Sequence, residues 1–213
     1  MINKISFQQK LKIKIKIINA LIYRELITRV SKNGLGILGI FGESFVSIFV
    51  FVFLFSIIRR NTIGGLDIYI FLICGIVVFN LFNSISVRSS NGITANKSLV
   101  SSFKNLKPID AVLSRGILEL FLYFILFSLL IILVFLIKEI ITINNLIFIG
   151  LSFLNIFILS ISYGIFLMII CHKFDFFRLI IVGISRPIFL TSGIFFQVYS
   201  LPDFIKPFVV WNP

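Results

Sequence analysis

The sequence is poor in the residues on which most enzyme sites depend. Its 213 residues include one histidine, two cysteines and eight aspartates and glutamates together. Nothing in the chain resembles a nucleotide site, a metal site or a catalytic triad. Residues 92–98 fall short of a phosphate-binding loop, because the stretch is one residue too short and Asn96 replaces the second glycine. We therefore expect a chain that is not itself an ATPase and that holds no metal or cofactor.

The few cysteine, histidine and acidic residues form no chemical pattern. Cys74 and Cys171 lie in apolar runs without the spacing of a redox or metal pair, so we expect buried free thiols. His172 stands alone at a boundary and receives no role. No relay of Asp, Glu or His side chains crosses the apolar runs, which disfavours a proton-driven transporter.

Long apolar runs are what the chain has in abundance. Hydrophobic residues make up 59% of it and its mean hydropathy is +1.12, above the soluble norm of about half apolar. Five runs are each long enough to cross the ~30 Å hydrocarbon core of a bilayer as a helix. Unbroken runs favour helices over the alternating strands of a barrel, so the sequence predicts an all-α polytopic membrane protein, one domain over 1–213. The predicted spans are 36–58, 67–87, 108–137, 143–171 and 179–198.

The net charge of +12 is concentrated in three segments. Basic residues crowd 1–32, 88–115 and 172–178, whereas the other connectors hold few. By the positive-inside rule these three segments are cytoplasmic, which places the N-terminus inside. A basic face against anionic lipid accounts for the excess charge, and we expect no nucleic-acid partner.

Two segments outside the spans are distinctive. In 7–32, apolar residues recur at steps of three and four, which predicts an amphipathic helix lying in the cytoplasmic interface. A basic tail that only sets the topology is the alternative. Between the second and third spans, 88–107 is the longest polar stretch inside the membrane region, with room for one or two short helices.

Charged residues near the spans supply further candidates. Glu43 and Arg186 are intramembrane ionisable residues close to a cytoplasmic boundary, and such residues are functional candidates by default. A purely structural helix–helix partner for Glu43 is an open alternative. Arg115 and Glu119 lie four residues apart and can share one helical face, so we expect a structural ion pair between them.

Aromatic residues gather at two places. A stripe that includes Phe41, Phe45 and Phe49 recurs every four residues in the first span. Packing or lipid contact explains such a stripe, and the lining of a path for a stacked ligand is the alternative. Tyr199 and Trp211 belong to a second group at the external end, where an aromatic membrane belt and a platform for sugar rings are both open.

Several segments, in this order, resemble a single family. They read LIYRELITRV at 21–30, GLGILGIFGE at 34–43, LKPIDAVLSRGILE at 106–119, HKFDFFR at 172–178 and LPDFIKPFVVWNP at 201–213. The chain resembles, over nearly its whole length, the KpsM-like capsule polysaccharide export permeases, the transmembrane subunits of type-2 ABC transporters. The block from Pro108 to Glu119 and the terminal segment carry the most specific part of the likeness.

The resemblance implies a permease of the bacterial inner membrane for a lipid-linked capsular or related cell-surface polysaccharide. Two copies would pair with two copies of a separate ATPase subunit, which holds the ATP and Mg²⁺, and would work with periplasmic or outer-membrane export proteins. Segment 88–107 would contain the coupling helix, and the interface helix at 7–32 would also face the ATPase. The coupling residues it implies are Arg24, Arg29, Arg88, Ser89, Asn91, Gly92, Asn96 and Lys97.

A translocation path at the interface of the two permease copies is a hypothesis that follows. Its candidate lining is Phe41, Glu43, Phe45, Phe49, Tyr199 and Trp211. The sequence departs from the family in having Ser44, where proline often follows the acidic residue. It also ends at Pro213, so we expect 199–213 to be an external gate region that lacks the rest of the gate and a sixth span. An exporter of a drug or small lipid, and a non-ABC membrane scaffold, are the alternative functions.

Overall fold

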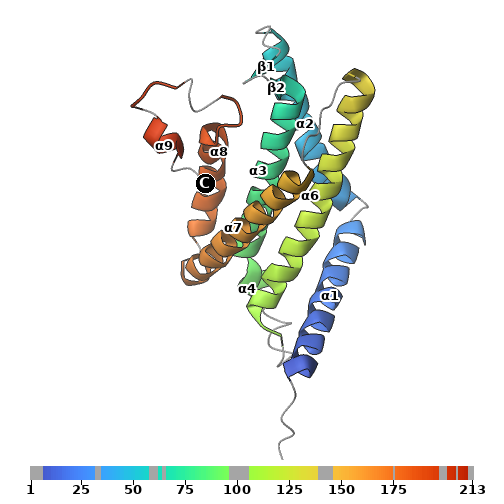
Figure 1. Ribbon diagram of the computed structural model, residues 1–213. Helices are drawn as coiled ribbons and strands as arrows, with labels where there is room; N and C mark the ends of the chain where they lie inside the picture. The colour runs from blue at the N-terminus through green and yellow to red at the C-terminus, as the bar shows by residue number, and fades with distance from the viewer. Residues whose placement is uncertain are drawn as a thin grey trace, which may run out of the picture.

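The computed structural model describes residues 7–31, 35–57, 62–63, 66–95, 106–138, 146–174, 176–196, 201–204 and 206–210. Most of these residues are helical, so the predicted all-α polytopic fold is confirmed (Figure 1). The helices are α1 (Phe7–Ser31), α2 (Leu35–Ile57), α3 (Ile68–Ser90), α4 (Gly92–Ala95), α6 (Pro108–Lys138), α7 (Leu146–Lys173), α8 (Phe177–Thr191) and α9 (Lys206–Val210). Two short strands, β1 (Thr62–Ile63) and β2 (Leu66–Asp67), connect α2 to α3.

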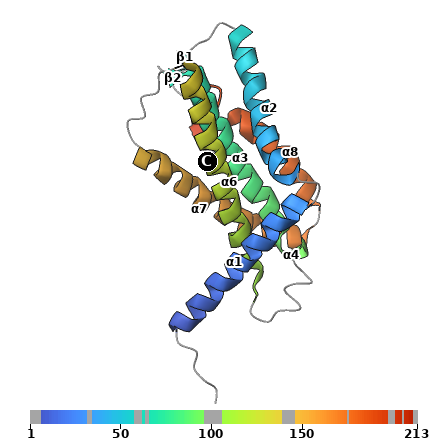
Figure 2. The same ribbon diagram turned by 90° about the vertical axis from the view of Figure 1, so that its right-hand side faces the viewer.

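Three of the described helices, α3, α6 and α7, are long and apolar enough to cross a membrane. Within α2, the described side chains give a shorter apolar stretch, Ser44–Phe55. Helices suit this setting because each satisfies its own backbone hydrogen bonds where no water is present. In Figures 1 and 2, α7 is inclined to α3 and α6 in both views, so it meets them obliquely.

The core lies where α3 packs against α6 and α7. The side chains of Leu72, Ile76 and Leu81 on α3 are completely buried there. Glycine allows the closest approach: a Cβ atom at Gly164 of α7 would lie 2.6 Å from the Cβ atom of Ser89 on α3. Small residues at such crossings replace the hydrophobic drive that lipid does not supply.

A hairpin and a capped helix start lie between α2 and α3. Strands β1 and β2 are antiparallel, with Thr62 opposite Asp67. The Asp67 carboxylate accepts a 3.0 Å hydrogen bond from the backbone N–H of Tyr69. It therefore satisfies one of the free N–H groups at the start of α3.

The last predicted span, 179–198, differs from the observed helix. Helix α8 ends at Thr191, and its 15 residues extend about 22 Å, less than the ~30 Å hydrocarbon core. Gly193 then has φ of 71°, in the left-handed region that glycine adopts readily. The chain bends here, and Ile194 packs against α3 at Gly75, where a Cβ atom would lie 2.8 Å from the Ile194 side chain.

Helix α1 covers Phe7–Ser31, where the sequence predicts an interface helix over 7–32. Its second half contributes apolar side chains to the core: Leu21 is buried, and Ile22 and Leu26 contact the core. The side chains of Leu11 and Ile15 are about half exposed. Figure 2 shows α1 crossing the ends of the other helices and extending away from them.

The two cysteines are free thiols, but only one matches the predicted burial. Cys171 is buried in α7, whereas Cys74 lies on an exposed side of α3. An apolar run does not by itself fix burial, because in a membrane helix the apolar surface also faces lipid.

Candidate functional site

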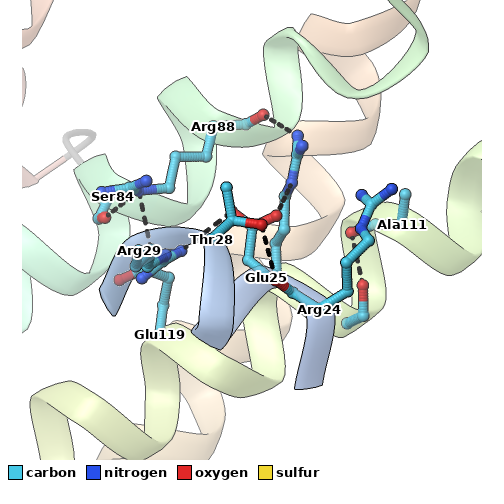
Figure 3. Close-up of polar contacts among 10 residues, drawn as sticks. Arg24, Glu25, Thr28, Arg29, Ser84, Arg88, Ala111 and Glu119 are labelled. Carbon is cyan, nitrogen blue, oxygen red and sulfur yellow. Dashed lines mark hydrogen bonds and ion pairs between the residues drawn. The ribbon is translucent and has the colours of Figure 1, made fainter. Parts of the chain in front are cut away.

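A cluster of charged side chains joins α1, α3 and α6 at one end of the helices, with Glu119 at its centre. The Oε1 atom of Glu119 accepts hydrogen bonds from Arg29 Nη2 at 2.6 Å and lies 2.8 Å from Arg88 Nε. The Glu119 side chain is fully buried and that of Arg29 is 7% exposed. Figure 3 shows the three side chains converging from three different helices.

A second carboxylate completes the cluster. Glu25 Oε2 lies 3.4 Å from Arg115 Nε, and its Oε1 lies 3.5 Å from Arg29 Nη2. Arg115 also donates a 3.3 Å hydrogen bond from Nη1 to the carbonyl oxygen of Arg88. Three guanidinium groups thus face two carboxylates, and we call these five residues the charge cluster.

The ion pair predicted between Arg115 and Glu119 is replaced by pairs between helices. Arg115 pairs with Glu25 of α1, and Glu119 pairs with Arg29 and Arg88. The physical reason is that α1 brings Glu25 to Arg115, while α1 and α3 bring two guanidinium groups to Glu119. A fully buried carboxylate is stabilised most by guanidinium groups that surround it.

A further ion pair fixes the first half of α1 to the start of α6. Lys14 Nζ lies 2.7 Å and 2.5 Å from the two carboxylate oxygens of Asp110. Asp110 also accepts a 2.9 Å hydrogen bond from the backbone N–H of Lys107. A carboxylate in the first turn is favourable there, because it faces the positive end of the helix dipole.

The charge cluster makes α1, α3 and α6 one mechanical unit. Separating α1 from α6 would break the buried Arg29–Glu119 pair, and breaking a buried pair typically costs about 3–5 kcal/mol. The charge cluster therefore links α1 and the end of α3 to α6.

A groove of about 740 Å³ lies between α2, α3 and α8. Its lining combines hydroxyl, amide and guanidinium groups with aromatic rings, in a chain that is otherwise mostly apolar. The polar residues are Ser47, Asn80, Asn83, Ser185 and Arg186; the aromatic ones are Phe51, Phe79 and Phe189. In the described part of the chain, no three His, Cys, Asp or Glu side chains gather as a metal site would require.

Long apolar helices, a further helix (α1) fixed to them by buried charges, and a groove of mixed polar and aromatic lining fit the architecture of a permease. The sequence matches the family of ABC-2 type transporters over residues 17–213. The chain belongs to that family. The resemblance predicted from the sequence is thereby confirmed.

Comparison with individual relatives supports the same family assignment. It is 30% identical over 196 residues to the polysialic acid transport protein KpsM of Escherichia coli, which covers 92% of this chain and 76% of that protein. It is 27% identical over 208 residues to the capsule polysaccharide export inner-membrane protein BexB of Haemophilus influenzae, 98% of this chain and 78% of the other. With the corresponding protein CtrC of Neisseria meningitidis, identity is 27% over 212 residues, 100% of this chain and 80% of the other.

The structure buries three of the eight predicted coupling residues. Arg29 and Ser89 are buried, and Gly92 packs so tightly that a Cβ atom would lie 2.9 Å from Met168. These three residues are therefore almost inaccessible to a second protein. Arg88 is partly exposed but points to Glu119, Arg24 and Asn91 are half-buried, and Asn96 and Lys97 lie outside the described residues.

The three predicted path residues whose side chains are described, Phe41, Phe45 and Phe49, do not line this groove. Phe45 and Phe49 are exposed and border a separate, almost wholly apolar hollow between α2, α3 and α6. Phe41 is half-buried against the core. The groove is lined instead by the other side of α2, including Ser47 and Phe51. The Glu43 side chain, Tyr199 and Trp211 lie outside the described residues.

Some residues of the site could be found in the sequence and others could not. Arg186, a charge inside an apolar run, is a sequence candidate that the structure places in the groove. Glu25 and Lys14 were missed. Glu25 is the single acidic residue of α1, which is a usable signal, but its partner lies 90 positions away along the chain.

Proposed function

We propose that this chain is the permease subunit of an ABC exporter that moves a lipid-linked capsular or related polysaccharide out of the bacterial cytoplasm. The mixed lining of the groove between α2, α3 and α8 is the observation that carries this proposal. Sugar hydroxyls can bond to amide and hydroxyl side chains, while the apolar faces of sugar rings can pack on Phe51, Phe79 and Phe189. The relatives named for polysialic acid and capsule polysaccharide support the same substrate class.

A groove open on one side suits an assembly of two copies, which would close it into a path. Two copies of a separate ATPase subunit, holding ATP and Mg²⁺, would supply the energy. On the cytoplasmic side, that subunit would contact the segment that follows α3 together with the exposed parts of α1. The N-terminus would be cytoplasmic, and Lys10, Lys12 and Lys16, which are exposed on α1, would also meet anionic lipid headgroups. Periplasmic or outer-membrane export proteins would receive the polymer.

In this mechanism the charge cluster transmits the movement of α1 and α3 to α6. Closure of the ATPase dimer pushes on α1 and on the end of α3, and Glu119 passes both displacements to α6 through Arg29 and Arg88. The helices around the groove then tilt, and the path opens. The ATPase partner supplies the chemistry, and this chain binds, guides and releases the polymer.

The test is purification of the tagged protein from its native membrane, followed by transport assays. We expect an ATPase subunit at one to one, and ATP-dependent entry of a fluorescent lipid-linked oligosaccharide into inverted vesicles. Vesicles that carry an inactive ATPase variant are the control. Uptake of hydrophobic drugs but not of the glycolipid would favour the small-molecule exporter. Absence of any ATPase from the intact, folded protein would favour a scaffold.

A further inference from the structure

Arg186 is a cation in an unusual place. It lies on α8, about 13 Å along the helix from Phe177 at a rise of about 1.5 Å per residue. The residues around it in α8 are mostly apolar, and a charge at this depth of a membrane is costly and typically has a specific partner. Its side chain is exposed to the groove rather than enclosed by protein.

The described acidic side chains are already engaged elsewhere. Within that part of the chain, no ion pair to Arg186 is formed. Glu25 and Glu119 pair with arginines, Asp110 pairs with Lys14, Asp203 pairs with Lys206, and Asp67 caps α3. Among the described residues, Arg186 therefore faces the groove and has no acidic partner.

The polar neighbours of Arg186 in the groove are neutral groups that form hydrogen bonds. Ser185 precedes it on α8, and Ser47 of α2 and Asn80 and Asn83 of α3 line the same groove. The two asparagines lie about 15 Å and 10 Å from the end of α3, a depth similar to that of Arg186. The Asn80 amide is positioned by a 3.0 Å hydrogen bond to the Ser44 hydroxyl. A guanidinium among neutral donors is suited to a carboxylate or phosphate, which it can bind with two parallel hydrogen bonds.

Aromatic rings lie beside this polar patch. The ring centroids of Phe79 and Phe189 are 4.9 Å apart, and those of Phe51 and Phe189 are 5.9 Å apart. Such a wall accommodates the apolar face of a sugar ring better than a small hydrated anion. The groove volume of about 740 Å³ falls in the range of about 300–1,000 Å³ that ligand sites have.

We propose that Arg186 binds an anionic oxygen group of the transported lipid-linked glycan, with Asn80 and Asn83 beside it, so that the permease prefers molecules that carry this anion. This rests on the proposed function, because it takes the groove as the glycan path. The group is a sugar carboxylate or the phosphate that links the glycan to its lipid. Both present the same chemistry to a guanidinium.

The test measures binding to the permease–ATPase complex in lipid nanodiscs. Three probes are compared: a sialic acid oligomer, the same oligomer with its carboxylates converted to methyl esters, and a neutral oligosaccharide joined to diacylglycerol by a phosphodiester. We expect the wild-type complex to bind at least one anionic probe about tenfold more tightly than the ester, with the difference shrinking at high salt. Dependence of the first or the third probe on Arg186 distinguishes carboxylate from phosphate.

The variants distinguish the effect of the Arg186 charge on binding from a loss of folding. Arg186→Gln should abolish the preference, while Arg186→Lys should keep part of it. Lys173→Gln, which removes an exposed cation at the end of α7, should change nothing. Intact co-purification with the ATPase shows that each variant is folded. Equal affinity of wild-type and Arg186→Gln complexes for every probe would overturn the proposal.

Glu43, which follows the groove residue Gly42 in the sequence, provides an independent check. If Arg186 served an internal ion pair with Glu43, the double variant Glu43→Gln/Arg186→Gln would regain the export rate of the wild type, and that result would also overturn the proposal. Absence of all ATP-driven glycan export by the wild type would instead contradict the proposed function. Wild-type export with unchanged selectivity in Arg186→Gln contradicts only the anion site.

Discussion

The guanidinium of Arg29 and the carboxylate of Glu119 lie 2.6 Å apart, although 90 residues separate them in the sequence. Both side chains are buried, and Arg88 approaches the same carboxylate oxygen at 2.8 Å. Glu119 is thereby the point at which α1, α3 and α6 meet. Its replacement tests whether the charge cluster holds these helices together.

Glu119→Gln should destabilise the protein severely. The change keeps the shape of the side chain but leaves Arg88 without its carboxylate and Arg29 with only the longer contact to Glu25, and breaking a buried pair typically costs about 3–5 kcal/mol. We expect a clear fall in the Tm of the detergent-solubilised protein, measured by fluorescence-detected size-exclusion chromatography after heating. Asp203→Asn is the control, because it removes a carboxylate from the pair with Lys206 in which Asp203 is 94% exposed. Equal Tm values for the two variants would contradict a structural role for the cluster.

The Lys14–Asp110 pair should couple α1 to α6 in a measurable way. Lys14→Gln and Asp110→Asn should each lower the Tm, and the double variant should lose less than the sum of the two losses, because both single changes remove the same contact. Asp110→Asn should cost more, since Asp110 also accepts the Lys107 N–H and faces the helix dipole. Strictly additive losses would show that the two side chains do not interact in the membrane.

The sequence predicts the long helices well because length and apolarity alone determine them. Helices α3, α6 and α7 correspond to the predicted spans at 67–87, 108–137 and 143–171 within a few residues. The early end of α8 was not predicted, since it depends on how Gly193 lets Ile194 reach a gap beside Gly75. Such a contact has no signature in a single sequence.

For the functional residues, too, the sequence predicts one part and not the other. The sequence reveals that Arg115, Glu119 and Arg186 are costly charges near or within membrane helices. It does not reveal their partners. The spacing of Arg115 and Glu119 allows a pair within α6, but in the folded protein both residues pair with residues of other helices. For Phe49, the spacing predicts an aromatic stripe along α2. It does not predict which side of α2 faces the groove.

Gly164 should tolerate no side chain, because α7 and α3 touch at this point. The Cβ atom of alanine there would lie 2.6 Å from the Ser89 Cβ atom and 2.8 Å from its hydroxyl oxygen. We expect Gly164→Ala to cost on the order of 1–3 kcal/mol, the usual penalty of overpacking, and to lower the Tm accordingly. Gly150→Ala on the same helix, where nothing lies within 4 Å, should leave the Tm unchanged or raise it slightly.

A second-site change shows whether the clash is with Ser89 itself. Ser89→Gly in the Gly164→Ala background removes the atoms that the new methyl group meets, so part of the lost Tm should return. Recovery should be incomplete because glycine inside a helix costs about 1 kcal/mol. If the double variant were less stable than Gly164→Ala alone, the α3–α7 contact would be arranged differently.

The side of α2 that guides the glycan can be identified with leucine substitutions. Phe51 lines the polar groove beside Phe189, whereas Phe49 is 72% exposed and faces the separate apolar hollow. Aromatic contacts are worth about 0.5–1.5 kcal/mol beyond their buried area, so Phe189→Leu and Phe51→Leu should each slow glycan export about two- to tenfold. Phe49→Leu should export at the wild-type rate, with all rates compared at equal amounts of protein in the membrane. The reverse pattern, in which only Phe49→Leu slows export, would move the path to the stripe that includes Phe45 and Phe49.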